Sequence, residues 1–166
     1  MDKFLKLGLS EEVLKSLVGL GIEEPTDIQE KAIPEILKGK NVIGKAETGT
    51  GKTLAYLLPI IEKIDDSKNE MQAIILSPTH ELGVQINNVL NDLKRGLGKK
   101  ITSTTLVGSG NIKRQMEKLK NKPHILVGTT GRILELINKK KITTNTIKTI
   151  VIDEGDKLLD FINIKD

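Results

Sequence analysis

The sequence predicts an α/β fold: one domain with a mostly parallel β-sheet and helices on both faces of that sheet. Short apolar segments rich in β-branched residues alternate along the chain with segments that have helical spacing. Most of the apolar segments carry no alternating polar residues, which is typical of strands that are buried on both faces. The length of 166 residues fits one domain with a hydrophobic core of its own.

The elements follow from these patterns in chain order. Two helices are predicted first, from 11 to 20 with Ser10 as N-cap, and from Thr26 or Asp27 as N-cap to 37. Five apolar segments are predicted as strands, namely 42–43, 73–76, 101–107, 125–127 and 149–152. Helices are predicted between them, namely at 52–64, 81–93, 112–119 and 133–138. Because helices separate the strands, we expect the strands to run parallel.

The composition excludes several classes of protein. The chain has no cysteine, which rules out disulfides and thiolate metal sites. It has no apolar run of membrane-spanning length and no signal-peptide core, so we expect no membrane partner and a cytoplasmic location. A net charge of +4 is compatible with nucleic-acid binding, but one Tyr, two Phe and no Trp argue against base stacking. The lysine clusters at 99–100, 118–120 and 139–141 are interpreted as solvated faces, with a binding stripe as the alternative.

A glycine-rich segment at 46–53 lies between a predicted strand and a predicted helix, which is the context of a phosphate-binding P-loop. Gly49 and Gly51 allow the backbone to curl around a phosphate, and Lys52 supplies a cation. Ala46 stands where the general P-loop pattern has its first glycine, and the alternative is a glycine turn before an ordinary helix. The segment predicts nucleoside triphosphate binding with Mg²⁺ on the Thr53 hydroxyl. The expected binding residues are Thr48, Gly49, Thr50, Gly51, Lys52 and Thr53.

Acidic residues at 153–156 come directly after the apolar strand predicted at 149–152. Ligands of parallel α/β sheets bind beyond the carboxyl ends of the strands. In a P-loop protein, Asp153 in this place is expected to hold the Mg²⁺ water shell, and Glu154 to orient or deprotonate the attacking water. The predicted catalytic residues are therefore Lys52, Asp153 and Glu154, and the predicted metal ligands are Thr53 and Asp153. A charged loop that caps a strand is the alternative.

Further motifs follow one another along the chain. They are Phe4 with the segment 21–29, the P-loop at 46–53, Pro78-Thr79-His80 within 78–83, Gly108-Ser109, Thr129 to Arg132, and the acidic segment at 153–156. In this order they resemble the Q motif and motifs I, Ia, the double glycine, Ib and II of the DEAD-box ATP-dependent RNA helicases. The resemblance covers nearly the whole chain and implies that residues 1–166 form an N-terminal RecA-like P-loop NTPase domain, with the Q motif region at about 1–30.

The resemblance implies ATP and Mg²⁺ as cofactors. Gln29 is expected to read the N6 and N7 edge of adenine, because its amide both donates and accepts hydrogen bonds. Phe4 is expected to cover the face of the base, and a core residue that anchors a helix is the alternative.

The resemblance also implies RNA as a partner, held through phosphates and 2′-hydroxyls and therefore independently of sequence. Arg132 is the leading RNA-binding residue, with a structural ion pair as the alternative. Five positions depart from the family pattern, namely His80, Gly83, Ser109, Thr130 and Gly155. Most of them fall on the RNA track, so we expect intact nucleotide chemistry with an altered grip on RNA. The expected RNA-binding residues are Pro78, Thr79, His80, Gly108, Ser109, Thr129, Gly131 and Arg132.

The chain ends ten residues after Asp156, whereas the family continues into a second RecA-like domain that supplies arginine fingers. We therefore expect a fragment that binds nucleotide but neither unwinds duplexes nor hydrolyses ATP appreciably, because a missing arginine finger costs about 10³–10⁵ in rate. The expected partner besides RNA is that second domain, and we expect a monomer. The alternatives are a nucleotide-gated, non-catalytic RNA- or protein-binding module, and a P-loop enzyme of another class such as a kinase or a transporter ATPase.

Overall fold

The structure of the protein is a computed structural model that describes residues 1–156. The chain divides into two compact units, and we describe each by itself. Unit 1 comprises residues 1–65 and 89–100, and unit 2 comprises residues 66–88 and, among the described residues, 101–156. The prediction of one domain over 1–166 extends outside the described residues and stays a prediction. The prediction that the chain is a fragment of a longer protein also stays a prediction. None of the helices in residues 1–156 is both long and apolar enough to cross a membrane.

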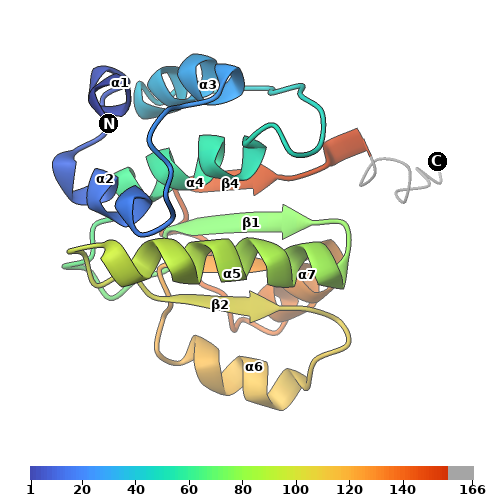
Figure 1. The fold of residues 1–166 in the computed structure, drawn as a ribbon. Coiled ribbons are helices and arrows are strands. Elements are labelled where there is room, and N and C mark those ends of the chain that lie inside the picture. Colours follow the sequence, from blue (N-terminus) through green and yellow to red (C-terminus); the bar gives the residue numbers. More distant parts are fainter. Residues whose placement is uncertain (157–166) are drawn as a thin grey trace. The chain divides into compact units, whose positions relative to one another are not determined.

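A parallel β-sheet forms the centre of unit 2 (Figure 1). Its strands are β1 (Ala73–Ser77), β2 (Ser103–Leu106), β3 (Ile125–Thr129) and β4 (Thr149–Ile152), in the order β2-β3-β1-β4. Each pair of neighbouring strands is parallel, with Ala73 opposite Ile125 on one side and Thr149 on the other. The prediction of a parallel α/β sheet is confirmed for these strands.

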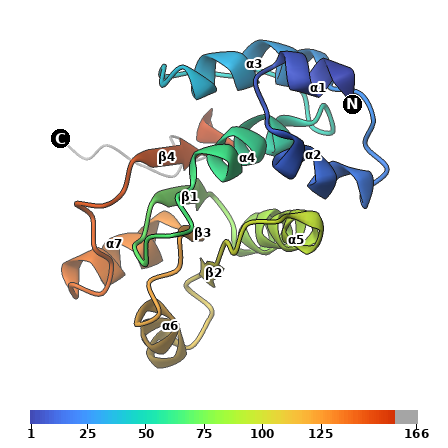
Figure 2. The same ribbon diagram turned by 90° about the vertical axis from the view of Figure 1, so that its left-hand side faces the viewer.

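Helices cover both faces of the sheet (Figure 2). α6 (Ile112–Leu119) and α7 (Thr130–Asn138) lie on one face, and α5 (His80–Gly96), whose first part belongs to unit 2, lies on the other. One hydrophobic cluster joins α6 and α7 to the sheet; its buried members are Met71, Ile74, Leu106, Leu119, Leu126, Ile133, Leu136 and Ile142. Burying each such side chain stabilises the fold by about 1.5–3 kcal/mol.

A buried histidine connects the starts of three strands. His124 precedes β3, and its Nδ1 accepts a hydrogen bond of 3.0 Å from the backbone N–H of Thr102, just before β2. Because Nδ1 accepts, Nε2 carries the ring proton and donates it over 2.9 Å to the carbonyl of Lys68, ahead of β1. His124 is 6% exposed, so the ring holds both of these backbone groups from a buried position.

Unit 1 is helical. Its elements are α1 (Asp2–Lys6), α2 (Glu11–Val18), α3 (Asp27–Leu37), α4 (Lys52–Lys63) and the end of α5. Ser10 caps α2 as predicted, and its hydroxyl and backbone N–H both donate to the carboxylate of Glu62 on α4. The Lys99 ammonium donates to the carbonyls of Ile61 and Glu62, which satisfies the C-terminal end of α4.

One prediction for unit 1 was wrong, and one helix was missed. Residues 42–43 form no strand, and Val42 and Ile43 are 40% and 101% exposed. Two apolar residues are too short to identify a strand, because a strand also needs a paired neighbour. Helix α1 was not predicted at all, and at five residues it is too short to show helical periodicity. The other helices and strands lie where they were predicted, with ends that differ by a few residues.

Candidate nucleotide site and nucleic-acid interface

The glycine-rich segment of unit 1 forms a tight loop that opens α4. Gly49 and Gly51 have φ angles of +84° and +85°, a region that side chains rarely adopt. Gly51 is the N-cap of α4, so Lys52 and Thr53 lie in the first helical turn. The Thr50 hydroxyl donates over 2.6 Å to the carbonyl of Glu47 and closes the loop. A helix N-terminus with free backbone N–H groups and an adjacent lysine is suited to an anion.

Gln29 contacts this loop from α3. Its Oε1 accepts a hydrogen bond of 3.0 Å from the backbone N–H of Thr26, which makes a capping box, and its Nε2 donates over 3.0 Å to the carbonyl of Gly51. A side-chain amide has two donor hydrogens and two acceptor lone pairs, so one of each remains. These match the N7 acceptor and N6 donor of adenine. Gln29 is only 2% exposed, so its role as the adenine reader stays a prediction that requires this corner to open.

Phe4 lies on α1 and is completely buried in the structure. The alternative interpretation, a core residue that anchors a helix, describes this position. Its predicted contact with a nucleotide base would require the ring to become exposed, and it stays a prediction.

The two predicted catalytic acids follow β4 in unit 2. The backbone N–H of Asp153 donates over 2.9 Å to the carbonyl of Leu76, which extends the sheet by one bond. The Asp153 carboxylate accepts a hydrogen bond of 2.9 Å from the backbone N–H of Glu154. Glu154 has a φ angle of +49°, a strained conformation for a residue other than glycine. The chain therefore turns sharply at the strand end and presents both half-buried carboxylates there.

The predicted RNA-binding residues gather at the same edge of unit 2. Pro78, Thr79 and His80 follow β1, Gly108 and Ser109 follow β2, and residues 129–132 end β3 and begin α7. Because the strands are parallel, their carboxyl ends meet at one edge of the sheet (Figure 1). The nucleotide-binding residues belong to unit 1, so Thr53 and Asp153, the two predicted metal ligands, lie in different units.

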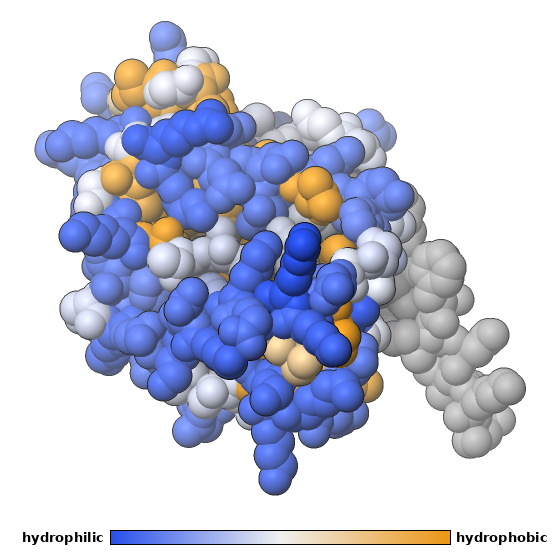
Figure 3. Space-filling view, turned by 90° about the horizontal axis from the view of Figure 1, so that it is seen from below, coloured by the Kyte–Doolittle hydropathy of each residue, from blue (hydrophilic) through white to orange (hydrophobic). Residues whose placement is uncertain are grey.

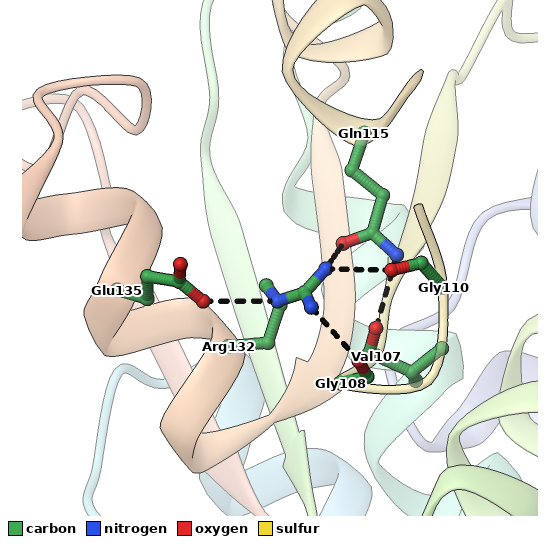
Figure 4. A network of polar contacts seen from close by, with 6 residues as sticks. All are labelled: Val107, Gly108, Gly110, Gln115, Arg132 and Glu135. Carbon is green, nitrogen blue, oxygen red and sulfur yellow. Dashed lines mark hydrogen bonds and ion pairs between the residues drawn. The ribbon is translucent and has the colours of Figure 1, made fainter. Parts of the chain in front are cut away.

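Arg132 makes internal contacts rather than pointing into solvent (Figure 4). Its Nη1 donates to the carbonyl of Gly110 over 3.1 Å and to Oε1 of Gln115 over 2.8 Å, and its Nη2 donates to the carbonyl of Gly108 over 2.8 Å. Its Nε forms an ion pair of 3.2 Å with Glu135, and the side chain is 10% exposed. The guanidinium thus fixes the loop after β2 onto α7. Direct RNA binding by Arg132 stays a prediction, and the alternative of a structural ion pair describes what the structure contains.

Sequence reasoning missed Gln115 and Gly110. Gln115 on α6 receives the Arg132 donor, and its Nε2 donates over 3.0 Å to the carbonyl of Val107. A side chain at Gly110 would collide with the Gln115 amide. The two glycines at 108 and 110 were the only sequence signal for this network. Backbone carbonyl acceptors cannot be recognised from a sequence, because every residue has one.

The comparisons with known proteins agree with this arrangement. A sequence model of the family described as "DEAD/DEAH box helicase" matches residues 26–165 of this chain. The chain belongs to this family. Among curated DEAD-box relatives, the RNA helicase CshA of Bacillus cereus is 43% identical over 166 residues, and CshA of Limosilactobacillus reuteri is 48% identical over 157 residues. These alignments cover 100% and 95% of this chain but 31% of each relative, so the chain spans about a third of their length.

Solved DEAD-box structures have the same fold. A DEAD box protein from Methanococcus jannaschii superposes with a TM-score of 0.90 at 38% identity, over 98% of this chain and 44% of that one. A variant of S. cerevisiae Dbp5 bound to RNA and ADP BeF3 superposes with a TM-score of 0.83 at 33% identity, over 95% of this chain and 39% of that one. The predicted RecA-like α/β fold is confirmed.

Two of the departures from the DEAD-box pattern contact each other. The Ser109 hydroxyl, which stands in place of a glycine, hydrogen-bonds Nδ1 of His80, which stands in place of an arginine. The loop after β2 is thus attached to the start of α5 by a contact that the family pattern of Gly and Arg cannot form. Both residues are exposed, so they lie on the surface of the predicted RNA track.

A third departure, Gly83, is explained by the packing of α5. A Cβ at this position would lie 2.9 Å from the Ser77 hydroxyl and 3.6 Å from Cγ1 of Val107. The Ser77 hydroxyl is held in place because it donates over 3.0 Å to the carbonyl of Thr79. The first turn of this DEAD-box helix therefore approaches β1 so closely that alanine at 83 would require the Ser77 hydroxyl to move. At Gly155, by contrast, a Cβ would make an ordinary contact of 3.6 Å with Ile152.

Proposed function

We propose that this chain is the ATP-binding part of an ATP-dependent RNA helicase, which couples ATP binding and hydrolysis to RNA binding and local duplex unwinding. The observation that carries the proposal is the glycine-fixed loop at the start of α4 with the Gln29 amide on it. Family membership supports the same conclusion, as do curated relatives that are named ATP-dependent RNA helicases.

The nucleotide phosphates would lie at the N-terminus of α4. Backbone N–H groups of the loop and the Lys52 ammonium bind them there, and the helix dipole adds to the attraction. Mg²⁺, when bound, neutralises charge on the phosphates, with the Thr53 hydroxyl and the Asp153 carboxylate as its proposed protein ligands. Glu154 orients the attacking water and accepts its proton.

RNA would follow the carboxyl edge of the unit 2 sheet. Exposed backbone and short polar side chains after β1, β2 and β3 suit phosphates and 2′-hydroxyls, and carry no base-reading geometry. The whole protein is proposed to be completed by a second RecA-like domain, without which this chain binds nucleotide but does not unwind RNA. The alternative of a non-catalytic, nucleotide-gated module predicts no RNA-stimulated ATPase even in the longer protein.

The adenine contact gives the sharpest test of this proposal. We expect the chain to bind Mg-ADP about 5- to 150-fold more tightly than Mg-GDP, because a hydrogen-bonded base contact such as that proposed for Gln29 discriminates by about 1–3 kcal/mol. In Gln29→Glu the carboxylate still accepts from the Thr26 N–H, but the amide donors to the Gly51 carbonyl and to adenine N7 are both lost. The preference for adenine should therefore disappear, and the loss of the loop contact should weaken the binding of both nucleotides. Isothermal titration calorimetry of both nucleotides measures this.

Gln85→Glu is the matched control for this titration, since Gln85 is an exposed residue of α5 with the same change in chemistry. It should leave both affinities unchanged. Equal binding of ADP and GDP by the unsubstituted chain would remove Gln29 as the base reader, and absence of any nucleotide binding would contradict the proposed function.

The pair His80 and Ser109 allows a test of the RNA track. We expect His80→Arg to tighten binding of single-stranded RNA, because it places a permanent cation where the family has one. One added phosphate contact should steepen the salt dependence of the binding constant by about 0.7 on a double-logarithmic plot. Fluorescence anisotropy at several salt concentrations measures this slope, with Ser109→Gly as the control that releases His80 without adding charge. An unchanged slope in His80→Arg would show that RNA does not pass this position.

A further inference from the structure

A group of lysines lies at the amino edge of the unit 2 sheet, opposite the carboxyl edge that carries the predicted RNA-binding residues. α6 and α7 begin after the carboxyl ends of β2 and β3 and run back along the sheet, so both helices end at the amino edge of the strands (Figure 2). Lys120 and Lys139 are the C-caps of these two helices. We call the six residues there the lysine edge; they are Lys118, Lys120, Lys122, Lys139, Lys140 and Lys141.

The two halves of the lysine edge converge in space although they are far apart in the sequence. A surface depression of about 340 Å³ is lined by residues of both halves, with Lys120 on one side and Lys140 and Lys141 on the other. Met116, Glu117 and Leu119 complete its lining. Leu119 also packs in the hydrophobic cluster with Leu136 of α7, so shared core contacts hold the two helix ends together.

The charge of this region is strongly one-sided. From 116 to 148 the sequence has seven lysines and Arg132 against two acids, Glu117 and Glu135, which are paired with Lys120 and Arg132. All six residues of the lysine edge are exposed. Within residues 1–156, the ion pair of Lys120 with Glu117, at 2.7 Å, is the one salt bridge that this group makes. Figure 3, which shows the side of the molecule where α6 lies in Figure 1, has a largely hydrophilic surface with scattered apolar spots.

Helix ends alone do not explain these lysines. A lysine in the last turn of a helix is favoured by the helix dipole, which accounts for Lys118. Lys140, however, follows α7 in a left-handed backbone conformation with a φ angle of +54°. The backbone N–H of Lys140 donates to the carbonyl of Ile137 and that of Lys141 to the carbonyl of Leu136, and the two bonds form a Schellman motif. Glycine or asparagine is the usual residue at that position. Lys122 likewise has a φ angle of +48°. Lysine is thus present where the backbone favours other residues and where repulsion between like charges disfavours it.

We propose that the lysine edge is a second nucleic-acid binding surface, which holds the phosphate backbone of RNA through charge. A lysine ammonium is a point charge on a flexible stem, and only Lys120 of this group has a salt-bridge partner among the described residues. Such groups suit a regular polyanion better than a small ligand that needs a fixed donor geometry. The surface has no aromatic residue for base stacking, so this binding is independent of sequence. It goes beyond the proposed function because it uses none of the residues at the carboxyl edge and requires no nucleotide.

Salt-dependent RNA binding by the 166-residue chain tests this proposal. In the absence of nucleotide, the anisotropy of a labelled RNA hairpin is followed from 50 to about 200 mM salt, a range over which phosphate contacts dominate the change in affinity. The binding constant K falls as salt rises, so the slope of log K against log salt is negative. In the variant K120Q/K140Q/K141Q this slope should become less steep by about 2, since each lost phosphate contact accounts for about 0.7–0.9. Its binding of Mg-ADP should stay unchanged, which separates this outcome from a failure of the proposed function.

The control variant is K6Q/K15Q/K31Q, which removes the same charge from exposed lysines of unit 1. It should leave the slope within about 0.3 of the unsubstituted chain. An equal decrease of the salt dependence in both variants would show that only net charge matters, and it would overturn the proposal. An unchanged salt dependence in K120Q/K140Q/K141Q would also overturn it. If polyglutamate binds as tightly as RNA, and K120Q/K140Q/K141Q loses this binding, the surface would be assigned to an acidic protein partner instead.

Discussion

Replacing Gly51 with alanine is expected to destabilise unit 1 by about 2–4 kcal/mol and to prevent nucleotide binding at ordinary concentrations. Two costs add at this position. The φ angle of +85° disfavours any side chain, and the new Cβ would lie 2.5 Å from Nε2 of Gln29 and 2.9 Å from the Thr26 hydroxyl. Gln29 and Thr26 are held by the capping box, so neither can move away without losing the cap of α3. The change therefore disturbs the loop and the proposed base reader together.

Gly49→Ala provides the matched control for this prediction. Its φ angle of +84° is nearly the same, but among the described residues no other atom lies within 4 Å of the added Cβ. It should cost about 1 kcal/mol, from backbone strain alone. Urea unfolding followed by the fluorescence of Tyr56 measures both variants, because Tyr56 is the single tyrosine of a chain without tryptophan and lies on α4. Equal destabilisation by the two substitutions would show that the contact with Gln29 does not restrain the loop.

Replacing Arg132 with lysine is expected to destabilise unit 2 by about 2–4 kcal/mol although the charge is kept. Lysine has no planar fork, so a single ammonium cannot reach the carbonyls of Gly108 and Gly110 and the amide of Gln115 at once. Gln115 is only 6% exposed, so leaving its amide oxygen without a donor is costly, whereas the carbonyls of Gly108 and Gly110 are more accessible to water. Urea unfolding followed by circular dichroism measures the effect.

Arg114→Lys is the control for Arg132→Lys, because Arg114 is an exposed residue of α6. It should change the free energy of unfolding by less than about 0.5 kcal/mol. The same pair of variants separates the two interpretations of Arg132. If Arg132→Lys is as stable as the unsubstituted chain but binds RNA poorly, Arg132 contacts RNA directly. If stability and RNA affinity fall together, Arg132 acts by fixing the loop after β2.

Local patterns were sufficient to predict most of the fold. Strand β4 and helix α6 have the predicted bounds, since β4 is a continuous apolar run and Asn111 caps an amphipathic segment at the start of α6. The strand predicted at 42–43 failed because its assignment depended on a partner strand that two apolar residues cannot specify. Pairing is a tertiary property, and the sequence of one segment does not contain it.

The candidate site was predictable to a smaller extent. The glycines of the P-loop were identified because a positive φ angle leaves a direct mark on residue choice. The three hydrogen-bond partners of Arg132 were not identified, because two of them are backbone carbonyls and the third, Gln115, is one polar residue among many on α6. The contact between His80 and Ser109 was also missed, since each was interpreted as a separate departure from the family pattern.

Because Gly83 lies close to Ser77, the residue at one of these positions restricts which residues the other can accept. Alanine at 83 would collide with the hydroxyl at 77, whereas alanine at 77 removes only that hydroxyl and leaves Gly83 in place. Alanine at 83 therefore requires the Ser77 hydroxyl to rotate away or to be absent. The two positions are coupled, because the strand residue determines what a helix-favouring alanine at 83 costs.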